Sequence, residues 1–386
     1  MKLLTIRNYY RHYGAENHML RVARGLVRHG VDVHAAFPRA PSTASMIENC
    51  KANGISYWPF DMHSRYGAFP QKGSISSNLR MLSLLRTVQP DIVQITAGWQ
   101  PDIWPAAWSC ALCKIPVLAV FQLAVENCTL HPLKIRLLAW GRRRRQRWMA
   151  VSQQNLSALG QTFGTDPYEI GVLYNGTEIP PEAHAQNEAE TEAIRREVRI
   201  ELALPLHARL LFTTARLDEL KGHFDLLQIV PNIVDEFPDV LFVWAGEGNL
   251  QPALQAHVQH RSLQKHVRFL GYRNDIPRLL RASDLLVHPS HLEGGCSEAI
   301  REAMARGLPI VCSDAGGIPE VLQNGVHALM FKVRNTDEML VQLRTALSRP
   351  NMMRSLASQA RQRIRDFSSN RMVEDYFKVL KEICQD

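Results

Sequence analysis

Short apolar runs alternate with amphipathic helical patterns along the first 180 residues of the chain. Residues 3–6 predict a strand, and a polar loop over residues 7–13 follows it. Residues 15–29 then carry apolar side chains at helical spacing, and Gly30 ends this helix before a strand at residues 31–36. This order is typical of a parallel α/β sheet. Further strands of this set are predicted at residues 92–95, 117–121, 148–152 and 170–174.

The same alternation begins again after a polar, acidic stretch at residues 182–192. Residues 193–203 have a helical pattern, and five apolar runs with helices between them follow. These strands are predicted at residues 209–215, 240–245, 267–270, 285–288 and 309–312. We therefore expect an α/β protein with two Rossmann-like domains, residues 1–180 and 181–368, that face each other across a cleft. The last segment, residues 369–386, is expected to form a helix that packs back on the first domain.

The composition is that of a folded protein, with 46% hydrophobic and 21% charged residues. The longest apolar run, residues 115–125, has 11 residues and is too short to span a bilayer. Charged residues interrupt the first segment before the apolar core of a signal peptide can form. Seven irregularly spaced cysteines do not suggest a disulfide framework. These features lead us to expect a cytoplasmic location.

The chain is basic, with 45 Lys and Arg against 37 Asp and Glu and a formal net charge of +8. This balance favours an anionic partner, which could be nucleic acid, nucleotide phosphate or an acidic membrane surface.

A glycine-rich segment follows the predicted strand at residues 285–288. Glu293 and Gly294-Gly295 precede a helix that begins near Ser297. Glycines allow backbone N–H groups to approach an anion at a helix N-terminus, where the helix dipole favours negative charge. Glu302, farther along this helix, could accept hydrogen bonds from ribose hydroxyls. The alternative is an ordinary glycine turn capped by Ser297, with Glu302 on the helix surface.

Two cations follow the predicted strand at residues 209–215. Arg216 and Lys221 lie on either side of a turn that Gly222 ends. Two such cations can hold a diphosphate and offset the charge that grows on a leaving group. The alternative is a pair of solvated surface cations.

Together these segments resemble the retaining glycosyltransferases of family 4, which have two Rossmann-like domains (the GT-B fold). The resemblance covers nearly the whole chain and is closest at residues 209–331. The motifs that carry it are Tyr13-Gly14-Ala15-Glu16, Asn175-Gly176, Ala215-Arg216-Leu217 with Lys221-Gly222, Phe269-Leu-Gly-Tyr-Arg273, His288-Pro-Ser290, Glu302-Ala-Met-Ala305 and Asp314-Ala-Gly-Gly317-Ile-Pro-Glu320.

The resemblance implies a donor site in the second domain and an acceptor site in the first. Arg216 and Lys221 would hold the donor diphosphate, and Glu293 would face the transferred sugar; these three are the predicted catalytic residues. Glu302 would bind the ribose. The remaining donor-side residues would flank the base, line the sugar or approach the phosphates; they are Gly14, Gly271, Tyr272, Arg273, Gly294, Gly295, Cys296 and Ser297.

The resemblance also implies the reaction. A sugar, most often from a UDP-sugar in this family, would pass to a hydroxyl of a glycan or lipid-linked acceptor in polysaccharide or glycoconjugate biosynthesis. The anomeric configuration would be retained, with the leaving diphosphate helping to take the acceptor proton. The co-substrate is the nucleotide sugar, and neither a cofactor nor a metal is expected; the chain has no Asp-x-Asp motif to hold a metal.

Four features depart from the family pattern. Glu293 and Glu302 have eight residues between them where the family has seven, and Tyr13 replaces a glycine. An extra residue is absorbed as a bulge, or Glu293 lies elsewhere than its family counterpart. Gln94 and Gln122 stand where the family often has histidines. With Asn175, they are expected on the acceptor or sugar side, where glutamine can hydrogen-bond a hydroxyl but cannot act as an acid or base.

These departures keep two other functions open. One is a family member that binds a nucleotide sugar without turnover. The other is a sugar-nucleotide epimerase of the same fold, although we find no paired carboxylates or histidines placed to activate water.

Residues 131–150 carry seven Lys and Arg and no acidic residue, and Trp140 and Trp148 flank them. Such a segment can lie on anionic lipid headgroups, which would place the protein peripherally at the inner face of the membrane. The alternative is a solvated helix face with core tryptophans. A nucleic-acid partner is not expected, because it leaves the motifs at the strand ends unexplained.

Overall fold

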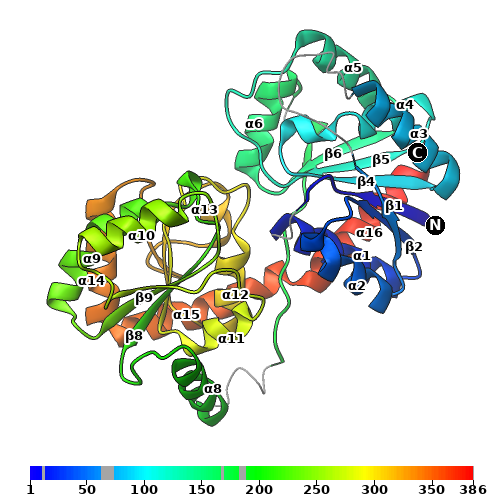
Figure 1. The fold of residues 1–386 in the computed structure, drawn as a ribbon. Helices are drawn as coiled ribbons and strands as arrows, with labels where there is room; N and C mark the ends of the chain where they lie inside the picture. The colour runs from blue at the N-terminus through cyan, green and yellow to red at the C-terminus, as the bar shows by residue number, and fades with distance from the viewer. Residues whose placement is uncertain (11–13, 62–73, 167–168, 182–187, 386) are drawn as a thin grey trace. The chain divides into compact units, whose positions relative to one another are not determined.

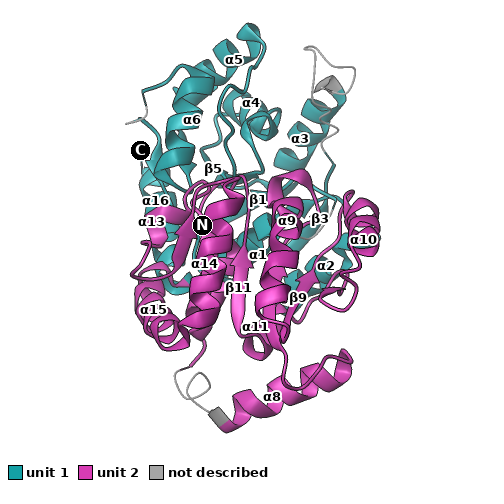
Figure 2. Cartoon of the chain, turned by 90° about the vertical axis from the view of Figure 1, so that its left-hand side faces the viewer, with its two compact units in different colours: residues 1–176, 369–386 teal, residues 177–368 magenta. Residues whose placement is uncertain are grey.

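The computed structural model describes residues 1–10, 14–61, 74–166, 169–181 and 188–385. The chain forms two compact units, shown in separate colours in Figure 2. Unit 1 comprises residues 1–176 and 369–386, and unit 2 comprises residues 177–368. The division therefore lies slightly before the boundary at residue 180 that the sequence suggested.

Unit 1 is built on a seven-stranded parallel sheet in the order β3-β2-β1-β4-β5-β6-β7 (Figure 1). The chain adds strands on one side of β1 and then switches to the other side at β4. The strands are β1 (Lys2–Ile6), β2 (Asp32–Phe37), β3 (Ser56–Pro59), β4 (Ile92–Ala97), β5 (Val117–Phe121), β6 (Gln146–Ala150) and β7 (Gly171–Val172).

Helices cover both faces of this sheet, so its strands are apolar on both sides. In β1, Leu3 belongs to one hydrophobic core and Leu4 to the other. The helices are α1 (Gly14–Arg28), α2 (Ala44–Ala52), α3 (Ser74–Val88), α4 (Ala106–Leu112), α5 (Pro132–Arg142), α6 (Gln153–Phe163) and α16 (Ser369–Gln385), with 3-10 turns at Pro41–Thr43 and Gln100–Ile103.

The last helix, α16, packs on α1 within unit 1, as the sequence predicted. The two helices approach closely at Gly25, where an added Cβ would lie 2.3 Å from a methyl carbon of Val373. His18 Nε2 lies 2.8 Å from the hydroxyl of Tyr376. The C-terminal segment thus completes the core of the first domain.

Unit 2 contains a six-stranded parallel sheet in the order β10-β9-β8-β11-β12-β13. Here the switch in strand order lies between β8 and β11. The strands are β8 (Arg209–Thr214), β9 (Val240–Ala245), β10 (Val267–Phe269), β11 (Leu285–His288), β12 (Ile310–Ser313) and β13 (Leu329–Phe331). The helices are α8 (Glu188–Glu201), α9 (His223–Glu236), α10 (Gln251–His260), α11 (Ile276–Ala282), α12 (Glu298–Arg306), α13 (Ile318–Val321), α14 (Thr336–Ser348) and α15 (Pro350–Arg363), with 3-10 turns η4 (Glu219–Lys221) and η5 (Ile364–Phe367).

The predicted fold class is confirmed, with two differences in detail. The strands β3 and β13 were not predicted from the sequence. The strand predicted at residues 148–152 is β6, which ends at Ala150 because Ser152 caps α6 instead. The Ser152 hydroxyl accepts a hydrogen bond from the backbone N–H of Asn155 at 3.0 Å.

Candidate functional site

The candidate site lies in unit 2, at the carboxyl ends of β8 and β11. These neighbouring strands flank the point where the strand order reverses. Open parallel sheets bind ligands at such switch points. The loop after β8 carries Arg216 and Lys221, and the loop after β11 carries Glu293, so the topology brings both predicted segments to one edge.

Lys221 and Glu293 form an ion pair at this edge. Lys221 Nζ lies 2.5 Å from Glu293 Oε1, and their side chains are only 15% and 12% exposed. His288, the last residue of β11, reaches the same oxygen, with its Nε2 at 3.0 Å. The Ser290 hydroxyl lies 3.4 Å from Lys221 Nζ. A cation and a carboxylate that lie far apart in the sequence are thus in direct contact.

The ion pair keeps Glu293 ionised. Burial alone would raise the pKa of this carboxyl, but the charge of Lys221 and the hydrogen bond from His288 hold its pKa well below the ordinary value. Glu293 is therefore an acceptor of hydrogen bonds and not an acid near neutral pH.

Two glycines with left-handed backbones allow the loops to meet. Gly222 has φ +67°, and a Cβ there would lie 2.0 Å from the carbonyl oxygen of Pro289. Gly316, after β12, has φ +56°, and a Cβ there would lie 1.8 Å from the carbonyl oxygen of Glu293. Only glycine fits such a close approach with this backbone. The glycine pattern thus fixes the position of Lys221 and Glu293.

Arg216 differs from Lys221 in being accessible. Its guanidinium pairs with Asp218 at 3.0 Å, and its side chain is 41% exposed. Asp218 also caps the turn at η4, where it accepts a hydrogen bond from the backbone N–H of Leu220 at 3.1 Å. The turn therefore presents one exposed and one largely buried cation.

The helix α12 begins where the glycine segment predicted it. Ser297 is the N-cap, and its hydroxyl accepts a hydrogen bond from the backbone N–H of Ile300 at 3.2 Å. Gly294, Gly295 and Cys296 are buried; burial raises the pKa of the Cys296 thiol to about 12, so it is not a nucleophile. Glu302 lies in the second turn of α12, and its ribose contact stays a prediction.

Residues 271–273, which were expected to flank the base, are only partly free to contact a ligand. Tyr272 is exposed, and its backbone N–H donates to Glu247 Oε1 at 3.4 Å. Arg273, however, is held by Asp275 at 2.8 Å and by Glu201 at 2.9 Å. These hydrogen bonds raise the pKa of its guanidinium. In this structure Arg273 ties α8 to the loop before α11, and Gly271 supports the loop through a left-handed φ of +66°.

In unit 1, uncharged amides lie beyond the ends of β5 and β7. Gln122 Oε1 accepts a hydrogen bond from Asn175 Nδ2 at 2.9 Å. Within the described part of the chain, the remaining buried amide atoms of this pair, Gln122 Nε2 and Asn175 Oδ1, have no hydrogen-bond partner. They could bind a ligand hydroxyl.

Gln94 does not join this pair at the strand end. It is the third residue of β4, is fully buried, and stands opposite Thr5 of β1 in the sheet register. Gly14 is exposed at the first position of α1, and Tyr13 lies outside the described residues. Near the start of α1, Glu16 accepts a hydrogen bond from Arg7 Nε at 2.6 Å, which ties α1 to the end of β1.

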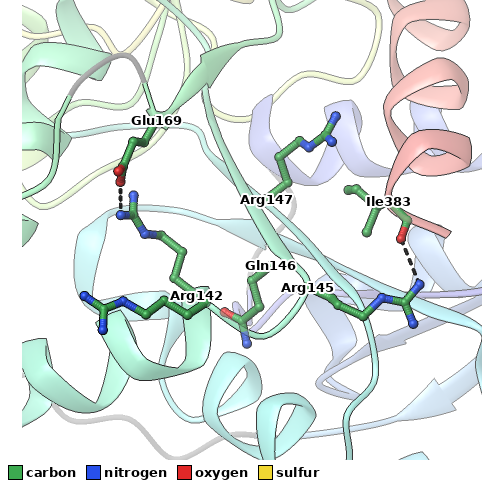
Figure 3. Close-up of a pocket in the computed structure, with 7 residues that line it drawn as sticks. Arg142, Arg145, Gln146, Arg147, Glu169 and Ile383 are labelled. Atoms are coloured by element: carbon green, nitrogen blue, oxygen red, sulfur yellow. Dashed lines mark hydrogen bonds and ion pairs between the residues drawn. The ribbon is translucent and has the colours of Figure 1, made fainter. Parts of the chain in front are cut away.

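The basic segment at residues 131–150 comprises α5, a turn and β6. Residues of this segment line an open hollow of about 380 Å³. Figure 3 shows that Arg142 reaches Glu169 there and that Arg145 reaches the carbonyl oxygen of Ile383, a contact of 3.1 Å. Trp140 is 36% exposed, and the Arg144 guanidinium lies 3.9 Å from the centre of its ring. The expectation for Trp148 was wrong: it is 1% exposed and packs on Phe163 in the core, because β6 is buried on both faces.

No three His, Cys, Asp or Glu side chains among the described residues are grouped as metal ligands. No helix in the described part of the chain is both long and apolar enough to cross a bilayer.

His288 is the site residue that sequence reasoning missed. It was noted only as part of a family motif. The signal that could have identified it is a titratable side chain at the end of an otherwise apolar strand.

Both units of the chain are similar to known proteins. Residues 194–363 match the family model described as glycosyl transferases group 1, and residues 13–179 match the model described as glycosyltransferase family 4. Spore coat protein SA of Bacillus subtilis is 34% identical over 185 residues, which cover 45% of this chain and 48% of that protein. An Escherichia coli UDP-Gal:alpha-D-GlcNAc-diphosphoundecaprenol alpha-1,3-galactosyltransferase is 30% identical over 178 residues, 45% of this chain and 44% of that protein. The chain spans about half the length of these curated relatives.

Solved structures share the whole fold. Anabaena HepE in complex with UDP has a TM-score of 0.81 at 19% identity, covering 99% of this chain and all of that one. A glycosyltransferase from Rickettsia africae has a TM-score of 0.82 at 16% identity, covering 100% and 99% of the two chains. The two family models together span most of the sequence, and the chain belongs to the family 4, group 1 glycosyltransferases with the GT-B fold.

Proposed function

We propose that this protein transfers a hexosyl group from a UDP-sugar to a hydroxyl of a glycan or glycolipid, with retention of anomeric configuration. One observation carries the proposal: Lys221 and Glu293 meet in a largely buried ion pair at the switch point of the unit 2 sheet. A transferase needs a cation for the leaving diphosphate and a polar group for the sugar. This edge supplies both.

The donor assignment is supported by the charge at this edge and by a structural neighbour. Lys221 and Arg216 are suited to a diphosphate, because charge-assisted hydrogen bonds to phosphate are among the strongest in proteins. The HepE structure with the same fold is described as a complex with UDP, and another as a complex with UDP-glucose. A UDP-sugar is therefore the donor that we propose.

The proposed chemistry requires the bond between the sugar and the diphosphate to break as the acceptor oxygen attacks from the same side. Negative charge grows on the leaving diphosphate, and Lys221 and Arg216 stabilise it. The diphosphate takes the acceptor proton. Because these two cations supply the compensating charge, we propose that no metal ion takes part, so that activity persists in excess EDTA.

The acceptor is assigned to unit 1, where Gln122 and Asn175 offer unpaired amide atoms. Such groups suit sugar hydroxyls, which both donate and accept hydrogen bonds. The E. coli relative and a Campylobacter jejuni relative, 25% identical over 230 residues, have names that specify diphosphoundecaprenol-linked sugars as acceptors. We propose a lipid-linked glycan of this class.

A transfer assay tests the proposal. UDP-glucose, UDP-galactose and UDP-N-acetylglucosamine are each incubated with the protein and a polyprenyl-diphosphate-linked sugar. UDP release and the mass and anomeric configuration of the product are measured. We expect an α-linked product from one donor. Release of UDP and free sugar without need of an acceptor would indicate an epimerase-type reaction, and nucleotide binding without product would indicate a binding protein.

We also propose that the protein contacts an anionic membrane surface through residues 131–150. Leu133 and Trp140 are exposed on α5, and Arg143, Arg144 and Arg145 are exposed after it. Exposed cations near a surface contribute about 1 kcal/mol each to binding of anionic lipid.

Co-sedimentation with phosphatidylglycerol vesicles tests this contact, with phosphatidylcholine vesicles as the comparison. The double variant Trp140→Ala/Arg144→Ala is expected to lose most binding to the anionic vesicles. Arg354→Ala, which removes an exposed cation from unit 2, serves as the matched control. Equal binding of both variants would contradict the proposal.

A further inference from the structure

Two groups contact Glu293 at a single oxygen atom. Lys221 Nζ lies 2.5 Å from Oε1, and His288 Nε2 lies 3.0 Å from the same atom. The carboxylate is nearly buried, and so is the imidazole, with a side chain that is 3% exposed. Glu293 therefore depends on Lys221 for its counter-charge and on both neighbours for hydrogen bonds.

Binding of an anionic diphosphate would disturb this balance. Lys221 cannot give its full charge to Glu293 and to a diphosphate at once. A buried carboxylate that loses its cation is strongly destabilised, because neither water nor a counter-charge replaces the lost interaction. A second positive charge at Glu293, or a proton on Glu293 itself, would restore the balance.

Few of the titratable groups packed around His288 could supply a second positive charge to Glu293. The groups packed there are Lys221 from η4, His223 from α9, Glu293 from the following loop and Cys312 opposite it on β12. Burial lowers the pKa of His223 to about 3, so His223 is neutral near pH 7. Burial raises the pKa of the Cys312 thiol well above its ordinary value, so this group is neutral as well.

His288 itself can accept the charge. With Nε2–H donating to Glu293, its other ring nitrogen carries no proton in the neutral tautomer. That atom, Nδ1, is buried and has no hydrogen-bond partner among the described residues. Protonation there creates an imidazolium whose Nε2–H bond to Glu293 is already in place.

We propose that His288 is a positioning residue that takes up a proton from solvent when Lys221 turns to an anionic diphosphate, and so keeps Glu293 ionised and in place. The inference rests on the proposed function, because it requires a diphosphate at Lys221. No covalent bond changes in this step. One proton moves from water or buffer to Nδ1 of His288.

The proposal predicts linkage between nucleotide binding and pH. Because the complex holds more protons than the free protein, affinity for the nucleotide rises as pH falls, by up to about tenfold per pH unit where binding takes up one whole proton. A purely structural histidine would produce no such linkage.

Calorimetry tests this linkage directly. UDP-glucose, UDP-galactose and UDP-N-acetylglucosamine are titrated into the full chain at pH 7.5, and the tightest ligand is used in MOPS and in Tris, buffers with different ionisation enthalpies. The diphosphate of a UDP-sugar has no group that titrates near this pH, so the buffer dependence reports protons taken up by the protein. We expect net uptake approaching about one proton for the wild type.

Three variants assign the proton. His288→Gln retains an N–H donor without a titratable ring; it is expected to bind the UDP-sugar with no proton uptake and with affinity nearly independent of pH. Glu293→Gln removes the charge that needs compensation and is also expected to abolish uptake, which keeps the test available if His288→Gln does not fold. His291→Gln alters a neighbouring histidine that pairs with Asp225 at 2.7 Å, and it should leave the uptake unchanged.

The outcomes separate this inference from the proposed function. Binding without proton uptake by the wild type, or uptake that persists in His288→Gln, would overturn the inference while leaving the donor site intact. In the second case Glu293 itself would be the proton acceptor. Absence of binding of all three UDP-sugars to the wild type would overturn the proposed function and the inference with it.

Discussion

The carboxyl edges of the two sheets have the same topology and opposite chemistry. In unit 2 the edge carries the Lys221–Glu293 ion pair, with 2.5 Å between Nζ and Oε1, and His288 Nε2 lies 3.0 Å from the same carboxylate oxygen. In unit 1 the ends of β5 and β7 carry uncharged amides, Gln122 and Asn175, with unpaired atoms. The unit 2 set stands at the switch point, where a parallel sheet binds ligands, and the unit 1 set lies at the carboxyl ends of strands farther along its sheet.

Under the proposed function, this difference corresponds to separate donor and acceptor roles for the two units. A site for a diphosphate must supply positive charge and must also neutralise it while the site is empty, which the Lys221–Glu293 pair does. A site for sugar hydroxyls needs neutral donors and acceptors. We therefore expect changes in unit 2 to affect the nucleotide and changes in unit 1 to affect the acceptor.

The largest expected effect follows from Lys221→Ala. Loss of a buried cation at a developing negative charge should lower kcat for transfer by about 100- to 1000-fold. Arg216→Ala removes a more exposed cation, so its effect should be about tenfold. Steady-state kinetics of UDP release with the lipid-linked acceptor measure both. If the two variants were equally active, the buried pair would have no special role.

The next effect concerns the backbone at the unit 2 edge. Gly222→Ala combines a left-handed φ with a Cβ 2.0 Å from Pro289 O, and it should destabilise the fold by about 2 kcal/mol or more. Gly325→Ala is the matched control, because Gly325 has φ +73° and no atom within 4 Å of the added Cβ. Urea denaturation of both variants separates two contributions to the loss of stability, the clash of the added Cβ with Pro289 and the cost of a left-handed backbone at alanine. Equal losses of stability would show that the close approach of the two loops is unimportant.

Whether a helix or strand could be predicted from the sequence depended on its length and on its position in the sheet. The long central strands and α1 were predicted closely because their apolar pattern is regular. The strand β3 was missed because it is a short edge strand that ends in Pro59 and is half exposed, so it lacks a continuous apolar run. The strand β13 has only three residues, too few to show a period, and unlike β10, which is equally short, it was not predicted.

The positions of the candidate site residues were predictable where glycines follow the end of a strand. The ion pairs and hydrogen bonds that these side chains form were less predictable. Lys221 and Glu293 were singled out separately, but nothing in the sequence shows that they share an ion pair. Arg273 was expected at the base, yet Glu201, 72 residues away, holds it. Trp148 was expected beside lipid because it follows the arginines, whereas the pairing of β6 with β5 places it in the core. Such outcomes depend on tertiary contacts that local patterns do not contain.

A smaller effect is expected in unit 1. Gln122→Ala and Asn175→Ala should lower transfer about tenfold through the acceptor, because each removes one hydrogen-bonding group, and should leave UDP affinity unchanged. Acceptor KM and calorimetric titration of UDP measure the two properties separately. A parallel loss of UDP affinity would contradict the division between the units.

The smallest effect is the acid dependence of stability. Since the folded-state pKa of Glu293 lies below the unfolded value, its stabilising contribution is present above about pH 4.5 and is lost as pH falls through the folded value. The difference in unfolding free energy between the wild type and Glu293→Gln should therefore be constant from pH 8 to pH 5 and shrink in more acidic solution. A difference that grew towards low pH would have the wrong sign.

Calorimetric titration of UDP, GDP and ADP into the wild type, Lys221→Ala and Gln122→Ala tests whether the unit 2 switch point is the donor site. We expect UDP to bind the wild type with a dissociation constant on the order of micromolar and Gln122→Ala equally well, and we expect Lys221→Ala to lose about two orders of magnitude in affinity. Failure of all three nucleotides to bind, or UDP binding that is unchanged in Lys221→Ala, would contradict the assignment of the unit 2 switch point as the donor site.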